Sequence, residues 1–167
     1  ILIIDDETEI CELIESYLVR EGFESIAVPT GREALAEVAD LKEGCETRHI
    51  EIPQYDAVLV WSQDGGSVVS EPEIANVLTR LQECPDYNKI LCSIKDGVLY
   101  MAVAQGKNLL IANSWNIQDF TTAEYYIFLT IKSLQINPEM SAICWLSSLD
   151  AEEEMSLYRY FKSVNIL

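Results

Sequence analysis

Residues 89–115 read KILCSIKDGVLYMAVAQGKNLLIANSW, and they carry the clearest strand pattern in the second half of the chain. It contains three runs with the composition of β-strands, Lys89–Ile94, Val98–Ala104 and Leu109–Trp115. Asp96-Gly97 separates the first two runs, and Gly106-Lys107-Asn108 separates the second two. Because short connections of this kind join antiparallel strands, the stretch predicts a three-stranded antiparallel sheet.

The residues that follow predict a helix, a strand, a second helix and the start of a last strand. A helix is expected from Thr121 or Thr122 to Leu134, where Asn137-Pro138 ends the pattern. Strand, helix and final strand are then expected at residues 141–146, 151–161 and 164–167. The order of three antiparallel strands, helix, strand, helix predicts a mixed sheet covered by helices.

The first half of the chain has a different pattern, in which strands and helices alternate. Strands are expected at residues 1–4, 23–28 and 56–61, and helices at 8–21, 30–40 and 73–82. Residues 40–54 and 62–72 are expected to be loops. Alternating strands and helices predict a parallel sheet, so the chain is expected to be an α/β protein.

Length and charge limit the function classes. The chain has 167 residues and is expected to divide into halves at 1–85 and 86–167, which can also form one continuous domain. Eleven basic and 28 acidic residues give a net charge of −17. This charge, without a local basic patch, argues against binding to nucleic acids or to an anionic membrane surface.

The five cysteines include no pair at CxxC spacing, which argues against a zinc site. Free thiols are typical of a reducing compartment, so a cytoplasmic location is expected.

Three segments of the first half carry a resemblance to a known family. They are Ile1-Leu2-Ile3-Ile4-Asp5-Asp6-Glu7, the helix end Glu21-Gly22-Phe23, and Thr30-Gly31-Arg32-Glu33-Ala34-Leu35. Together they resemble the receiver domain of two-component response regulators. The resemblance implies a flavodoxin-like parallel sheet and a Mg²⁺ ion held by Asp5 and Asp6. It also implies a phosphoacceptor Asp after the third strand and a switch hydroxyl, for which Ser93 is the candidate.

The acceptor position departs from this family pattern. It falls on Trp61, and an indole ring is not a nucleophile. Asp64, three residues further on, is the alternative acceptor.

The second half resembles a different family, through Asp96–Tyr100, Gly106–Ser114 and Thr122–Tyr126. It is similar to the C-terminal half of an uncharacterised Bacteroidetes family with an actin-like ATPase, or RNase H-like, fold. Nucleases with that fold hold two metals with acids, and Asp96, Glu124 and Asp150 occur at roughly those places. A turn or a helix start also explains each acid, and no GxxxxGK[ST] phosphate loop is present. Nuclease and ATPase activity are therefore not expected.

Three functional hypotheses follow. The first is a non-enzymatic signalling or interaction module with protein partners, in which the receiver-like half is degenerate. The second is a phosphoacceptor receiver that uses Asp64, with Mg²⁺ at Asp5 and Asp6 as its one cofactor. The third is an actin-like protein without retained activity.

Overall fold

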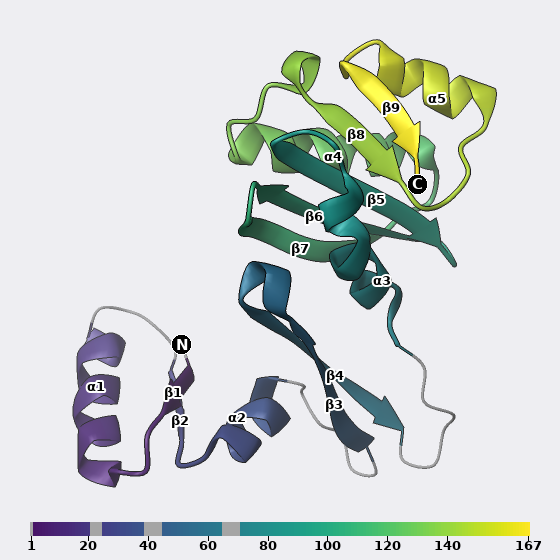
Figure 1. Ribbon diagram of the computed structural model, residues 1–167. Helices are drawn as coiled ribbons and strands as arrows, with labels where there is room; N and C mark the ends of the chain where they lie inside the picture. Colours follow the sequence, from purple (N-terminus) through teal and green to yellow (C-terminus); the bar gives the residue numbers. More distant parts are fainter. Residues whose placement is uncertain (1, 21–24, 39–44, 65–70) are drawn as a thin grey trace. The chain divides into compact units, whose positions relative to one another are not determined.

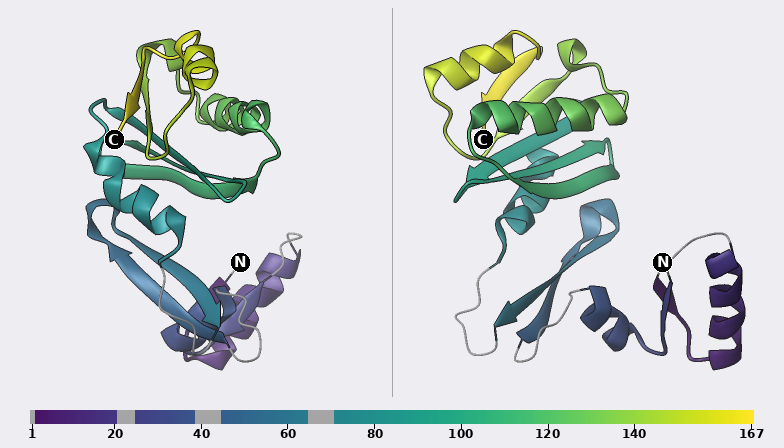
Figure 2. Two further views of the ribbon diagram at one scale, coloured as in Figure 1. Left: turned by 90° about the vertical axis from the view of Figure 1, so that its right-hand side faces the viewer. Right: turned by 180° about the vertical axis from the view of Figure 1, so that it is seen from behind.

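The computed structural model describes residues 2–20, 25–38, 45–64 and 71–167. The chain divides into two compact units. The first comprises Ile1–Ile50 and Val58–Val69, and the second comprises Glu51–Ala57 and Ser70–Leu167. The elements of both are labelled in Figure 1, and Figure 2 gives two further views.

The first unit contains two separate two-stranded sheets and two helices. Its elements, including two strands that extend into the second unit, are β1 (Leu2–Ile4), α1 (Thr8–Arg20), β2 (Ile26–Val28), α2 (Gly31–Val38), β3 (Cys45–Ile52) and β4 (Ala57–Asp64). β1 and β2 pair in parallel, as the alternation of strand and helix predicts. β3 and β4 pair with each other and are joined by the short helix η1 (Pro53–Tyr55).

The flavodoxin-like sheet expected here is not confirmed, and two local predictions are wrong. Residues 45–52, expected to be a loop, form β3, and β4 pairs with β3 instead of extending the β1–β2 sheet. With only two strands to cover, α1 leaves the apolar side chains Leu13 and Tyr17 more than half exposed.

The second unit contains a five-stranded sheet with the strand order β7-β6-β5-β8-β9. Its elements are α3 (Glu73–Arg80), η2 (Leu81–Glu83), β5 (Asn88–Lys95), β6 (Val98–Gln105), β7 (Asn108–Asn116), α4 (Phe120–Ser133), η3 (Pro138–Met140), β8 (Ala142–Trp145), α5 (Ala151–Tyr158) and β9 (Ser163–Ile166). β5, β6 and β7 are antiparallel, whereas β8 pairs in parallel with β5 and β9 in parallel with β8. The mixed sheet predicted from residues 89–167 is confirmed.

The two turns of the antiparallel strands have the backbone that their glycines predict. Asp96 and Gly97 both have positive φ, 52° and 73°, as in a type I′ turn. Gly106 has φ 59° and Lys107 does not have a positive φ, as in a type II′ turn. These two tight turns set the register of β5, β6 and β7 without a long connection.

The sheet lies between two helical layers. On one face, α4 and α5 cover a core that includes the fully buried Trp145, Met101 and Ile127. On the other face, α3 packs against β5, β6 and β7. The core therefore continues through both faces of the central strands, and the polar connections lie at the two ends of the sheet.

Among the helices of the described segments, none combines the length and the apolar composition needed to cross a membrane.

Candidate functional site

The predicted metal ligands Asp5 and Asp6 follow β1 in the first unit. Asp5 Oδ1 accepts a hydrogen bond from the Glu7 backbone N–H at 2.8 Å, and the Asp5 N–H donates to Val28 O at 3.2 Å. Asp5 also lines a cavity of about 120 Å³ together with Thr8 and Cys11. Within the described ranges, no group of three or more His, Cys, Asp or Glu side chains is arranged to hold a metal ion. Magnesium binding here stays a prediction.

The acceptor and switch candidates lie in different units. Trp61 is a half-buried residue of β4, and Asp64 ends that strand with a side chain outside the described part of the structure. Ser93 is buried on β5 in the second unit. Its hydroxyl donates to Glu73 Oε1 at 2.7 Å, and Lys95 Nζ lies 3.6 Å from the other carboxylate oxygen. Ser93 therefore already has a partner that joins β5 to the first turn of α3.

The three acids that match an RNase H-like nuclease differ in position and in hydrogen bonding. Asp96 forms the exposed β5–β6 turn. Asp150 is the N-cap of α5, where it accepts hydrogen bonds from the N–H groups of Glu152 and Glu153 in a full capping box. Glu124 lies in the first turns of α4, and its Oε1 is buried without a hydrogen-bond partner in the described structure. Asp96 and Asp150 thus have structural roles that need no metal.

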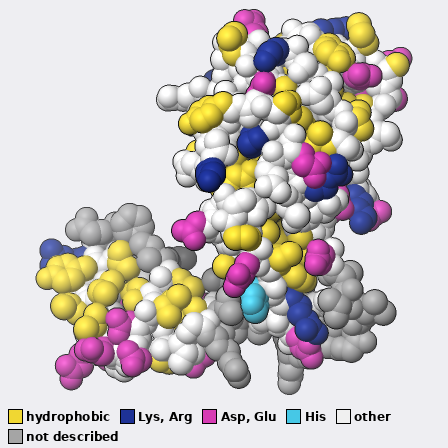
Figure 3. All heavy atoms as spheres, viewed as in Figure 1, with side chains coloured by type: hydrophobic (Ala, Val, Ile, Leu, Met, Phe, Trp, Pro, Cys, Tyr) yellow, Lys and Arg dark blue, Asp and Glu magenta, His cyan; other side chains and the backbone are white. Residues whose placement is uncertain are grey.

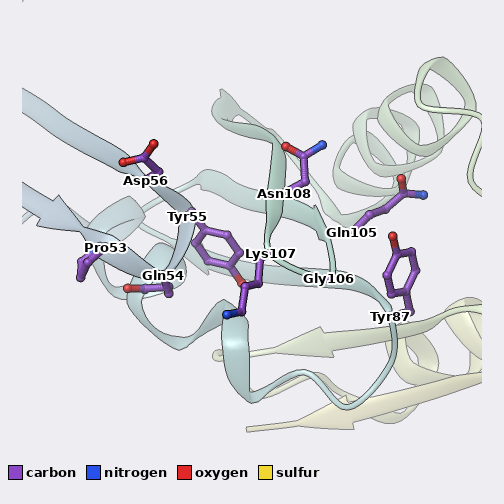
Figure 4. A pocket seen from close by; sticks show the side chains of 9 residues that line it. All are labelled: Pro53, Gln54, Tyr55, Asp56, Tyr87, Gln105, Gly106, Lys107 and Asn108. Carbon is purple, nitrogen blue, oxygen red and sulfur yellow. The ribbon is translucent and has the colours of Figure 1, made fainter.

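A groove lined by η1 and the β6–β7 turn lies in the second unit. We call it the Tyr55–Lys107 groove. It comprises two adjoining pockets of about 690 and 400 Å³. Their lining residues are Pro53, Gln54, Tyr55, Asp56, Gln82, Tyr87, Lys89, Gln105, Gly106, Lys107 and Asn108, and Figure 4 shows nine of them.

The turn that carries Lys107 is fixed by contacts with Tyr87. The Gly106 N–H donates to Tyr87 O at 2.9 Å. A Cβ at Gly106 would lie 3.0 Å from Tyr87 Cε2, so the glycine leaves room for the tyrosine ring. This ring is highly exposed, at 71%. The turn thus has a defined backbone and an aromatic ring packed against it.

Gln105 begins this turn, and a chain of hydrogen bonds between polar side chains holds its amide. Its Nε2 donates to Asn88 Oδ1 at 3.1 Å, and Asn88 Nδ2 donates to Ser141 Oγ at 3.1 Å. The Ser141 hydroxyl in turn donates to Asn137 O at 2.9 Å. Because Asn88 anchors Nε2 and is itself held by Ser141, the amide of Gln105 has a fixed orientation in the groove.

η1 lies against α3 and presents two side chains to the groove. Gln54 Nε2 donates to the Leu78 carbonyl at 3.4 Å. Tyr55 is buried, and its hydroxyl has no hydrogen-bond partner among the described residues. Burial, with a smaller contribution from the nearby Cys84, raises the pKa of Tyr55. The phenol therefore stays protonated and keeps a free O–H donor.

Two lysines give the groove a positive side in a strongly acidic chain. Lys89 Nζ donates to the carbonyls of Gln82 and Cys84. Lys107 is exposed and forms no ion pair with any described residue. Figure 4 shows the Asp56 carboxylate and the Lys107 ammonium pointing in different directions. On the face drawn in Figure 3, basic and acidic side chains are interspersed with apolar ones.

Sequence reasoning does not find this groove. The segments around Tyr55 and Lys107 are far apart in the chain, and each reads as an ordinary strand start or turn. Only the Gly106-Lys107 pair forms a recognisable local pattern, and that pattern predicts a turn, not a binding site.

Comparison with known proteins finds a similar solved structure and a matching family. The structure is similar to a crystal structure from Bacteroides thetaiotaomicron VPI-5482, described as a protein with actin-like ATPase fold and unknown function. The TM-score is 0.63 at 16% identity, over 84% of this chain and 62% of that protein. The chain thus spans under two thirds of that protein's length. None of the curated proteins matches the chain.

The predicted actin-like resemblance is confirmed at the level of fold. The receiver resemblance gains no support, because neither the similar structure nor the matching family is described as a response regulator. Residues 71–164, more than half of the chain and nearly all of the five-stranded sheet with its helices, match the family described as "Protein of unknown function (DUF3822)". The chain belongs to that family.

Proposed function

We propose that this chain is a non-enzymatic binding module with an actin-like fold, and that its Tyr55–Lys107 groove binds a carboxylate or phosphate group of its ligand. The observation that carries the proposal is Lys107, a cation without an ionic partner at the mouth of a polar groove. Lys107 supplies N–H donors, and Gln105 adds an amide whose orientation is fixed. Oxyanions accept several hydrogen bonds of this kind.

The lining of the groove favours binding over catalysis. It contains no Ser, Thr, Cys or His, so its described residues include no Ser–His or Cys–His pair of nucleophile and general base. Asp150 and Asp96, which a nuclease would need as metal ligands, support a helix start and a turn. The proposal therefore assigns binding to the groove and no chemical step to the acids.

The expected affinity for a free oxyanion is low. A single exposed lysine contributes little in water, and the net charge of −17 opposes the approach of an anion. We expect dissociation constants of about 1–10 mM for acetate and inorganic phosphate. A ligand whose apolar part also covers the exposed ring of Tyr87 is expected to bind more tightly.

Amide NMR titration tests the proposal. Sodium phosphate and sodium acetate are added in separate experiments, with ionic strength held constant by sodium chloride. Saturable shifts are expected at Gly106, Lys107 and Asn108. Lys107→Gln should weaken binding by about fivefold or more, because the variant keeps an N–H donor but loses the charge. Lys132→Gln, in the last turn of α4, is the matched control and should bind as the wild type does.

Equal shifts with chloride alone, or an unchanged affinity in Lys107→Gln, would overturn the assignment. A preference for phosphate over acetate, or the reverse, would identify the class of the natural ligand. A short peptide with one glutamate then distinguishes a protein partner from a small molecule, since a protein-derived ligand should bind more tightly than acetate.

A further inference from the structure

Two cysteines meet on the α3 face of the sheet, outside the groove. Cys84 directly follows η2, and Cys144 lies in β8, opposite Leu91 of β5. Both are buried, at 2% and 0% exposure. Cys84 Sγ contacts the Ile90 carbonyl oxygen at 3.7 Å, one residue before the register partner of Cys144. The two side chains therefore approach the same position on β5 from different elements.

The contact of Cys84 Sγ with Ile90 O and the register of Leu91 with Cys144 make the two thiols neighbours on this face of the sheet. Cys144 Sγ is also 4.0 Å from the Asn165 side-chain amide, which donates toward it from β9. The donors Cys84 and Asn165 together lower the pKa of Cys144, although burial opposes them. The same contact and burial raise the pKa of Cys84. The Cys84 thiol donates toward Ile90 O, whereas Cys144 Sγ accepts from Asn165, so Cys144 is the better nucleophile of the two.

Cys92 provides a contrast within the same sheet. It is buried on β5, in register with Trp145, and belongs to the core on the α4 face. Burial, with a smaller contribution from the nearby Cys144, raises its pKa, and no described side chain donates a hydrogen bond to its thiol. A buried thiol without such a partner is expected to be unreactive.

We propose that Cys84 and Cys144 form a redox-sensitive pair that a hydroperoxide converts into a disulfide. The Cys144 thiolate attacks one peroxide oxygen, and the O–O bond breaks. With hydrogen peroxide, this gives a sulfenic acid on Cys144 and one water, whose second proton comes from the Cys144 thiol. Cys84 sulfur then attacks Cys144 sulfur, and the departing hydroxide takes the Cys84 proton as a second water. Two thiols lose two electrons, and the peroxide gains them.

Access to the pair runs through the turn that carries Cys84. Its neighbours Glu83 and Pro85 are exposed, and η2 is a single short turn of helix. Local opening of such a segment costs much less than unfolding of the sheet. The resulting disulfide would link the α3–η2 segment to β8, which is far from it in the sequence. The bond would form close to Lys89, which donates a hydrogen bond to the Cys84 carbonyl.

Peptide mapping by mass spectrometry tests the pair in the full-length reduced chain. After exposure to hydrogen peroxide and alkylation of remaining thiols, a Cys84–Cys144 linked peptide is expected. It should exceed any linkage that contains Cys92 by about tenfold or more. In Cys84→Ser, Cys144 should remain a sulfenic acid that dimedone traps. In Cys144→Ser, Cys84 should stay reduced. The control Cys92→Ser should form the link as the wild type does.

Recovery of Cys84 and Cys144 as free thiols, while the half-exposed Cys45 is oxidised, would overturn the proposal. So would a link that forms equally among all five cysteines. If a serine variant fails to fold, the same peptide mapping of the wild-type protein in urea provides the test. A pair selected by the fold loses its preference there, whereas a preference that persists in urea contradicts a role for the fold. None of these outcomes depends on what the groove binds.

Discussion

Gly106 has the backbone conformation that most limits substitution near the groove. Its φ of 59° is unfavourable for a residue with a Cβ, and a Cβ would meet the Tyr87 ring at 3.0 Å. We expect Gly106→Ala to lower the free energy of unfolding by about 1–2 kcal/mol and to displace Tyr87. Urea unfolding followed by tryptophan fluorescence measures the loss.

Gly31→Ala is the matched control for this change. A Cβ at Gly31 meets no atom within 4 Å, and the residue opens α2 without a positive φ. The change should alter stability by less than about 0.5 kcal/mol. Equal effects of the two substitutions would show that neither the φ nor the Tyr87 contact constrains Gly106.

At the residue scale, sequence predicts what depends on the nearest neighbours in the chain. The Asp96-Gly97 and Gly106-Lys107 turns and the cap of α5 at Asp150 are confirmed, because a few adjacent residues determine each. The meeting of Tyr55 with Lys107 is not predictable in this way, since it depends on how η1 packs against α3. No motif spans the residues between them.

At the element scale, an aromatic cluster joins α4 to the segment that follows α5. The Phe128 ring centroid lies 4.9 Å from that of Tyr160, edge to face, and 5.9 Å from that of Phe161. Phe128→Ala removes both contacts from a half-buried site. We expect a loss of about 2–3 kcal/mol in the free energy of unfolding, measured by urea denaturation.

The neighbouring Leu129→Ala is the control for helix propensity and loss of apolar area. Leu129 is 49% exposed, so its truncation should cost less than about 1 kcal/mol. A double-mutant cycle between Phe128 and Tyr160 should give a coupling of about 0.5–1.5 kcal/mol. A coupling near zero would mean that the two rings touch without stabilising the fold.

The element that sequence reasoning missed is β3. In Cys45–Ile52 the side chains of Thr47, Ile50 and Ile52 are half-buried or buried, while Glu46 and His49 are exposed. Most residues in this stretch are polar or charged, and they obscure the short alternation of apolar side chains that indicates a strand. Its pairing with β4 diverts that strand from β1 and β2, so one missed element changes the predicted sheet of the first unit.

At the scale of the whole molecule, the two units bury apolar surface very unequally. In the first unit, the described buried apolar side chains are Ile3, Cys11, Val28 and Ala34. In the second unit, the central strands and their helices contain many side chains with no exposure at all. Since burial must offset the conformational entropy of ordering the chain, the second unit should be the stable one.

Hydrogen exchange followed by mass spectrometry on the full chain tests this inequality. The amides of β5, β6 and β8 should exchange last, with protection close to that for global unfolding. The amides of α1 should exchange faster by about a hundredfold or more, because a two-stranded sheet and exposed Leu13 and Tyr17 give that helix little to pack against. Equal protection of α1 and β5 would mean that the first unit is stabilised by contacts other than those among the described residues. Its receiver-like sequence would then specify a more complete fold than the β1–β2 pair.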